Sequence, residues 1–147
     1  MSQESKQESK RDITLEQAQA MITRAPYHQW LGLKVTALHD DGIELTAKWR
    51  EEWVVNSEMR YTHGGVLAAL VDLTADWAML KKVGRPVPTI DLRVDYHSAA
   101  MPGDLTCRGK IVRIGSQFSS SEAFIFDAQG KLLASGRGTY FNAPPKA

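Results

Sequence analysis

A single carboxylate at the centre of an apolar segment is the first feature of this sequence that points to chemistry. Nearly every residue from 66 to 80 is apolar or small, with Asp72 in the middle and Asp76 one helical turn later on the same face. A helix that is apolar all round is buried on most sides, and a buried carboxylate costs several kcal/mol unless it is paired or used. Asp72 is therefore a candidate base or nucleophile. The alternative is that the two aspartates mark the one solvated edge of the helix.

The tripeptide His63-Gly64-Gly65 lies where this helix should begin. The first N–H groups of a helix have no intrahelical acceptor, and the helix dipole favours negative charge at that end. Glycine lets a ligand approach the backbone closely, so the arrangement suits a carbonyl oxygen that becomes an oxyanion. The other interpretation is an ordinary glycine-rich helix start with His63 as its cap.

Composition excludes several other classes of protein. The 147 residues suffice for one domain, and the net charge of +1 argues against a nucleic-acid binder with a basic surface. The one cysteine, Cys107, excludes a disulfide framework and a cysteine-rich zinc site, and we expect it to be buried within a strand. No apolar run reaches the roughly 18–20 residues needed to span a bilayer, and the N-terminus lacks a secretory core, so we expect a cytoplasmic protein without membrane contact.

Motifs for phosphate loops, dinucleotides and serine-hydrolase elbows are absent, and the four histidines show no metal-binding spacing, so we expect no cofactor and no metal.

The positioning elements follow from hydrophobic periodicity and turn residues. Residues 1–12 contain Gln-Glu-Ser-Lys twice and are predicted to be a disordered tail, leaving 13–147 as a single domain. A capping box of Thr14 and Gln17 predicts a first helix, and Asp40-Asp41-Gly42 predicts a hairpin turn with glycine at positive φ. The segments predicted beyond these are a hairpin of 33–39 and 43–49, a long helix over 66–82, and strands 89–96, 105–114, 118–127 and 131–141. The last three should form an antiparallel meander, which gives an α+β layout.

His63-Gly64-Gly65, with Asp72 nine residues after the histidine, resembles the hotdog-fold acyl-CoA thioesterases of the phenylacetate-degradation (PaaI-like) group. Asn56 lies in the loop before the histidine, where that group has an asparagine, and Thr89 lies where it has a small hydroxyl residue. The segments 95–104 and 135–140 resemble its strand end with a proline-glycine turn and its last strand. The resemblance covers roughly Pro26 to Phe141. Arg60 stands where the group usually has glycine.

The resemblance implies a single hotdog domain, in which a sheet of about six antiparallel strands wraps around one long helix. It implies hydrolysis of an acyl-CoA thioester, with the Gly64 N–H polarising the carbonyl and Asp72 acting as general base or nucleophile. Asn56 would orient the thioester or water, and Thr89 would hold the water. Gly65 would bind the substrate by assisting Gly64 in holding the thioester oxygen, and His63 would shape the substrate-binding loop.

Gly64 and Asp72 are eight residues apart. On one helix this spacing separates them by roughly 12 Å along the axis. If both act on one carbonyl, the site contains two chains, and a two-fold dimer with antiparallel helices would supply it twice. Family members form such dimers, usually paired into tetramers, so a homotetramer is expected here.

Two other functions remain open at this stage. A non-catalytic hotdog module that binds acyl-CoA would share the fold. Binding alone does not require a carboxylate at Asp72, and burying one is unfavourable, which counts against this alternative. A hotdog hydratase or dehydratase would need a catalytic His and Asp in a different loop, which this sequence does not show. An aryl or medium-chain acyl group is the expected substrate, with Trp53 and Trp77 near the pocket.

Overall fold

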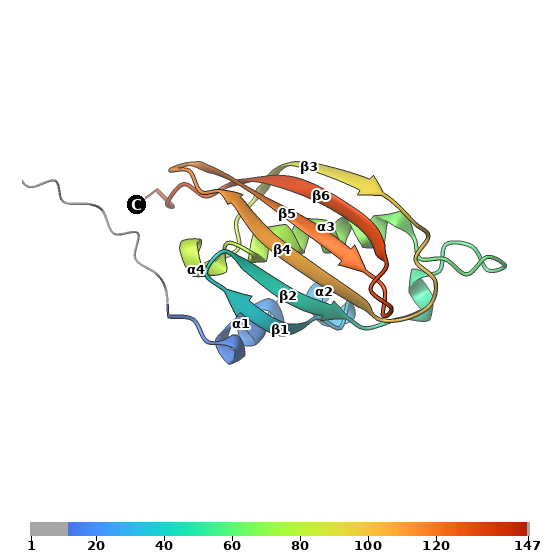
Figure 1. Cartoon of the computed structure of the whole chain (residues 1–147). Coiled ribbons are helices and arrows are strands. Elements are labelled where there is room, and N and C mark those ends of the chain that lie inside the picture. Colours follow the sequence, from blue (N-terminus) through green and yellow to red (C-terminus); the bar gives the residue numbers. More distant parts are fainter. Residues whose placement is uncertain (1–11, 147) are drawn as a thin grey trace, which may run out of the picture.

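The computed structural model describes residues 12–146 as a six-stranded antiparallel sheet that curves around one long helix (Figure 1). The strand order in space is β1-β2-β4-β5-β6-β3. The strands are β1 (Lys34–His39), β2 (Gly42–Ala47), β3 (Thr89–Tyr96), β4 (Leu105–Arg113), β5 (Phe118–Phe126) and β6 (Leu132–Phe141). The helices are α1 (Leu15–Ile22), α2 (Pro26–Trp30), the 3₁₀ turn η1 (Glu51–Trp53), α3 (Gly64–Trp77) and α4 (Leu80–Val83). The predicted α+β hotdog architecture is confirmed, and the predicted tail lies outside the described residues apart from Asp12.

Local sequence explains most of these boundaries. The Thr14 side chain accepts the Gln17 N–H while the Gln17 side chain accepts the Thr14 N–H, so the capping box that begins α1 is present. The prediction of a positive φ at Gly42 is wrong, because this residue is the first of strand β2 and pairs with His39 of β1. Glycine is needed there for space, since a Cβ would lie 2.4 Å from the Gly109 carbonyl oxygen.

The long helix begins two residues earlier and ends earlier than the sequence predicts. It runs from Gly64 to Trp77, and the chain turns at Ala78 and Met79 before the short helix α4. Two glycines beneath α3 allow it to lie close to the sheet. A Cβ on Gly109 would come within 2.4 Å of the Thr74 carbonyl oxygen, and one on Gly136 within 2.8 Å of the Val71 side chain.

One face of α3 is buried against the sheet, whereas the opposite face is only partly covered within this chain. The core side of the helix presents Leu67, Leu70, Val71, Leu73, Thr74, Ala75 and Trp77. The α3 residues that are not buried are Gly65, which is exposed, and the partly buried Gly64, Val66, Ala68, Ala69, Asp72 and Asp76, all small or acidic except Val66. The helix therefore presents a narrow stripe with room for another backbone to approach.

Strand β3 forms one edge of the sheet. It pairs with β6 on one side, and no strand within the described residues pairs with its other side. Ile90 and Tyr96 are 58% and 55% exposed at its two ends. Long, apolar, unpaired edges are templates for pairing with another chain.

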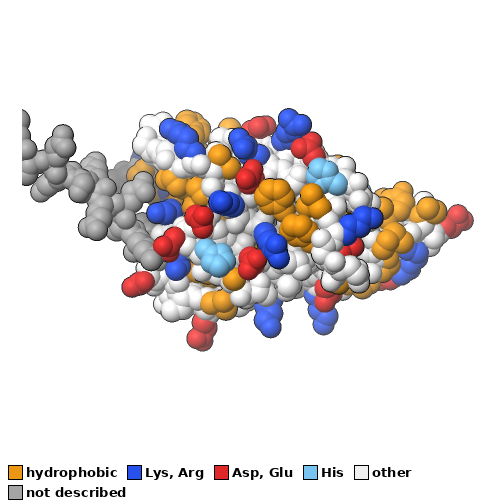
Figure 2. Space-filling view, in the orientation of Figure 1, with side chains coloured by type: hydrophobic (Ala, Val, Ile, Leu, Met, Phe, Trp, Pro, Cys, Tyr) orange, Lys and Arg blue, Asp and Glu red, His pale blue; other side chains and the backbone are white. Residues whose placement is uncertain are grey.

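The outer face of the sheet carries mixed charge. Acidic and basic side chains are interspersed over it, with some hydrophobic groups between them (Figure 2). In the part of the chain that the structure describes, no helix has the length and apolar character required to cross a membrane.

Candidate active site

The Asp72 carboxylate lies half-buried in the middle of α3, held by two hydroxyl groups from the sheet. Thr89 at the start of β3 donates its hydroxyl to Asp72 Oδ1 at 2.8 Å. Tyr140 of β6 donates to the Asp72 carbonyl oxygen at 2.8 Å, with Oδ1 at 3.2 Å. Fixed donors on one carboxylate oxygen hold the side chain in a single orientation and leave the other oxygen for chemistry.

Tyr140 was not among the predicted site residues. Burial, together with the neighbouring Asp72 and Asp76 carboxylates, raises the pKa of its hydroxyl far above the ordinary value, so it remains a proton donor. One feature of the sequence could have revealed it: Tyr140 alternates inward along its strand, and a buried tyrosine hydroxyl requires a hydrogen-bond partner.

At the other end of α3, the structure distinguishes the two glycines of the helix start. His63 is the N-cap residue, and its Nδ1 accepts the Gly65 N–H at 2.8 Å. The Gly64 N–H has no acceptor among residues 12–146. The Gly64 carbonyl accepts the Tyr96 hydroxyl at 2.7 Å, which fixes the helix start against β3. Gly64 is therefore the residue that offers an unused donor at the positive end of the helix.

Asn56 lies in the loop between η1 and α3, which extends away from the sheet (Figure 1). Its side-chain oxygen accepts the N–H groups of Glu58 and Met59, so that oxygen is used within the loop. The side-chain amide N–H₂ is the part that remains for a ligand.

Arg60, in the same loop, has a φ of 65°. Glycine adopts this left-handed conformation without steric cost, which explains why glycine suits this position. Its guanidinium pairs with Glu51 rather than with the pocket.

Within one chain, the predicted site residues fall into two separate places. Thr89 joins Asp72 beside a hollow of about 480 Å³, which is also lined by residues of the α1–α2 segment, of the second half of α3 and of the loop before β3: Met21, Arg24, Ala25, His28, Leu73, Asp76, Trp77 and Pro86. Gly64 borders a different hollow of about 400 Å³, together with Leu67, Tyr96 and residues 61–62 and 97–100. The single chain does not bring Gly64 and Asp72 to one point.

The two tryptophans expected near the pocket have different positions. Trp77 lines the hollow beside Asp72, and its ring meets the His28 ring edge-on at 6.3 Å. Trp53 is fully buried against Trp49 in the core, so the expectation that it lies at the pocket is wrong. Cys107 is buried as predicted, and burial raises the pKa of its thiol to about 12.

Asp76 shares the hollow with Asp72 and is only partly solvated. Burial raises the pKa of its carboxyl to about 7, a hydrogen bond from the Val87 N–H lowers it somewhat, and the Asp72 charge raises it further. The interpretation of Asp76 as part of a solvated edge is thus incomplete, because the carboxyl faces a cavity.

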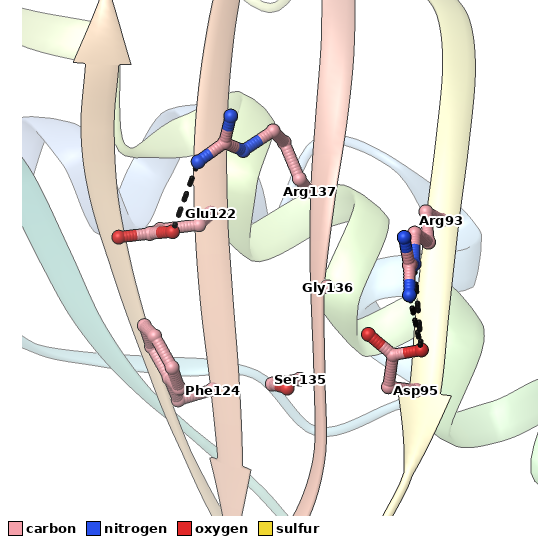
Figure 3. A pocket seen from close by; sticks show the side chains of 7 residues that line it. All are labelled: Arg93, Asp95, Glu122, Phe124, Ser135, Gly136 and Arg137. Carbon is pink, nitrogen blue, oxygen red and sulfur yellow. Dashed lines mark hydrogen bonds and ion pairs between the residues drawn. The ribbon is translucent and has the colours of Figure 1, made fainter.

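A third hollow, of about 310 Å³, lies on the outer face of the sheet across β3, β6 and β5 (Figure 3). Its charged groups neutralise one another: Arg93 contacts Asp95 at 3.4 Å, and Arg137 contacts Glu122 at 3.7 Å. Ser135 also lines this hollow, and its hydroxyl lies 2.7 Å from His97 Nε2, but both carboxylates of the hollow are paired with arginine, so it is a weaker candidate than the one beside Asp72. Residues 12–146 contain no group of three or more His, Cys, Asp or Glu side chains suited to a metal ion.

Comparisons with known proteins agree with this architecture. Residues 59–134 match the family model described as the thioesterase superfamily. A Halobacterium salinarum protein provisionally named as an esterase is 31% identical over 122 residues, covering 76% of this chain and 80% of that protein. The Escherichia coli protein named medium/long-chain acyl-CoA thioesterase YigI is 23% identical, covering 87% of this chain and 96% of its own.

Solved structures give the same result. A protein described as from the thioesterase superfamily superposes with a TM-score of 0.84 at 46% identity, over 86% of this chain and 96% of that chain. A Shewanella oneidensis protein described as related to the same superfamily superposes with a TM-score of 0.76 at 27% identity, over 88% and 95%.

Proposed function

The chain belongs to the thioesterase superfamily, and from that premise we propose that it hydrolyses an acyl-CoA thioester to the free acid and coenzyme A. The observation that carries the proposal is the Asp72 carboxylate, held by Thr89 and Tyr140 beside a mostly apolar hollow. Thioester hydrolysis needs a base or nucleophile next to a place for the acyl group, and this hollow provides both. The name of the Escherichia coli relative supports coenzyme A as the leaving group.

In the general-base form of the reaction, Asp72 takes a proton from water as the water oxygen bonds to the thioester carbon. The carbonyl oxygen becomes an oxyanion, the C–S bond then breaks, and the thiolate leaves and is protonated. In the nucleophilic form, an Asp72 oxygen bonds to the carbon first, the C–S bond breaks to release the thiolate and leave an anhydride with Asp72, and water then hydrolyses that anhydride to the free acid and the Asp72 carboxylate. Thr89 serves either form, because its hydroxyl donates to Asp72 while its oxygen can still accept a hydrogen bond from the attacking water.

The oxyanion requires a donor that this chain cannot bring to its own Asp72. We place the Gly64 N–H of a second copy there, with Asn56 of the same copy orienting the thioester through its amide N–H₂. A homodimer in which the two α3 helices pack antiparallel would bring Gly64 of one copy to Asp72 of the other. The partly uncovered small-residue face of α3 and the free edge of β3 both support such a pairing. Assembly into a tetramer, membership of the PaaI-like subgroup and a cytoplasmic location remain predictions.

The test is thiol release from a panel of aryl and medium-chain acyl-CoA thioesters, measured with a thiol reagent. The wild-type chain should release thiol from at least one of them, and Asp72→Asn should lose on the order of 10²–10⁴-fold in turnover. The amide keeps the shape of the side chain but is neither a base nor a nucleophile. Binding of acyl-CoA to the folded wild type without any thiol release would instead establish the non-catalytic acyl-CoA-binding module.

A further inference from the structure

We propose that Asp76, together with His28, forms the acyl-binding end of the hollow beside Asp72 and selects acyl groups that carry a hydroxyl about one helical turn beyond the thioester carbonyl. This inference rests on the proposed thioesterase function and adds a substrate class to it.

The position of Asp76 follows from the helix geometry. It lies four residues after Asp72 on the same face of α3, so the two carboxyl groups are offset by about 6 Å along the axis. Both line the hollow of about 480 Å³, and the rest of its wall includes Leu73, Trp77 and Pro86. An acyl group whose carbonyl lies at Asp72 and whose chain follows α3 toward its C-terminus therefore passes apolar groups and reaches Asp76.

The Asp76 carboxyl has unused hydrogen-bonding capacity. Its Oδ1 accepts the Val87 N–H at 3.1 Å, and this is its one hydrogen bond among the described residues. Arg24 and His28 line the same hollow, and neither they nor any other Lys, Arg or His in residues 12–146 forms an ion pair with it. Burial raises its pKa to about 7, so near neutral pH it can both accept and donate a hydrogen bond. A purely apolar acyl pocket would have no use for such a group, because desolvating it is unfavourable.

His28 adds a second acceptor to the same wall. Its Nδ1 lies 2.8 Å from the Ile22 carbonyl oxygen, which can only accept, so Nδ1 carries a proton. In the neutral ring Nε2 is then an acceptor, and within the described residues it has no partner. The ring is held in place against Trp77. The far wall thus offers a carboxyl and an imidazole nitrogen to whatever enters.

The Asp76 carboxyl and the His28 Nε2 atom favour some acyl chains over others. A hydroxyl satisfies Asp76 or His28 by donating, and it can also accept from the protonated carboxyl. An alkyl end of the same size removes water from both groups and leaves them without hydrogen-bond partners. This lowers kcat/KM by a factor on the order of 10- to 100-fold. A terminal carboxylate would meet both acidic groups, Asp72 and Asp76, and also the Arg24 guanidinium that lines the same hollow, so the alkyl substrate is the comparison that isolates Asp76.

The experiment compares kcat/KM for two acyl-CoA thioesters matched in size, 6-hydroxyhexanoyl-CoA and heptanoyl-CoA. The full-length wild type should prefer the hydroxy substrate over heptanoyl-CoA by about 10-fold or more. A ratio between substrates measured on one preparation does not depend on the fraction of protein that is folded.

Two variants assign the preference to Asp76. Asp76→Leu should reduce the ratio below about threefold or reverse it, because the leucine suits the alkyl chain. Asp76→Asn, which keeps an oxygen for the Val87 N–H and a polar end, should retain most of the preference. The matched control is Asp41→Leu, an exposed aspartate in the β1–β2 turn, which should leave the ratio unchanged.

The outcomes separate this inference from the function on which it rests. Equal rates for the hydroxy and alkyl substrates would overturn the selectivity and leave the thioesterase proposal intact. A hydroxyl preference that survives in Asp76→Leu would refute the role of Asp76. If the folded protein hydrolyses no thioester in this set or in the wider panel, the proposed function fails and the selectivity fails with it.

Discussion

Replacing Gly64 with proline removes one backbone N–H at the start of α3. Gly64 is the first helical residue, a position where proline is favoured because its missing N–H would have no intrahelical acceptor. The preceding residue, His63, has φ −55° and ψ 131°, the extended conformation that proline requires before it. We therefore expect Gly64→Pro to fold and to lose only the donor that we assign to the oxyanion.

The size of the effect follows from that single lost donor. Removing one oxyanion-hole donor typically lowers kcat by 10²–10³-fold, or about 2.7–4 kcal/mol. The matched control is Gly64→Ala, which keeps the N–H. Either variant adds a Cβ about 3.3 Å from the Tyr96 ring, so this steric change is shared, and proline adds only its two further ring carbons. The difference in kcat between the proline and alanine variants isolates the N–H.

Mixing then tests whether the site is shared between two chains. Gly64→Pro and Asp72→Asn are unfolded together at equal amounts and refolded, and thiol release is compared with each parent. If chains pair at random, half the dimers are mixed, and in a mixed dimer one site carries both defects while the other carries neither. About a quarter of all sites are then intact, so activity should recover to about a quarter of the wild-type value.

Two results would refute this reasoning. If a tagged pull-down shows that mixed dimers form and activity does not recover, the site is not built from two chains. If Gly64→Pro is as active as Gly64→Ala, the Gly64 N–H does not stabilise the oxyanion.

The remaining predictions concern the groups around this site. Thr89→Val keeps the side-chain shape and removes the hydroxyl that donates to Asp72, so kcat should fall about tenfold or more with a smaller change in KM; an unchanged kcat would contradict its role. Because the pKa of Asp76 is raised from 3.8 to about 7 in the folded state, the folded chain binds more protons in that range, and stability should fall as pH rises through it. Asp76→Asn should remove this dependence and gain up to about 4 kcal/mol over wild type above pH 7, measured by urea unfolding across pH 4–8. At Arg60, with φ 65°, the glycine variant should be more stable than the alanine variant by about 1 kcal/mol, and equal melting temperatures would argue against strain. Deletion of residues 1–11 should leave melting temperature and turnover within error, since this segment has no apolar residue beyond Met1.

Local patterns in the sequence determined the elements and the identity of the chemical groups. The capping box at Thr14, the alternation along strands such as β3, and the apolar run around Asp72 each depend on residues close in the chain, so the sequence predicts them directly. The fold class followed from their order. The break at Ala78 between α3 and α4 was missed, because the apolar run continues through it without a breaker residue.

The tertiary structure decided which of these groups meet. Thr89 and Asp72 are far apart in the sequence, and they come together because β3 crosses to the far edge of the sheet beside β6. Tyr140 reaches Asp72 because α3 packs against β6, and the crossing leaves the other side of β3 unpaired within the described residues. The cavity at Asp76 depends on α2 covering the end of α3, and no local pattern encodes that contact. Short-range propensity fixes where a strand or helix begins, whereas strand order and the contacts that enclose a cavity arise from packing between residues distant in the chain.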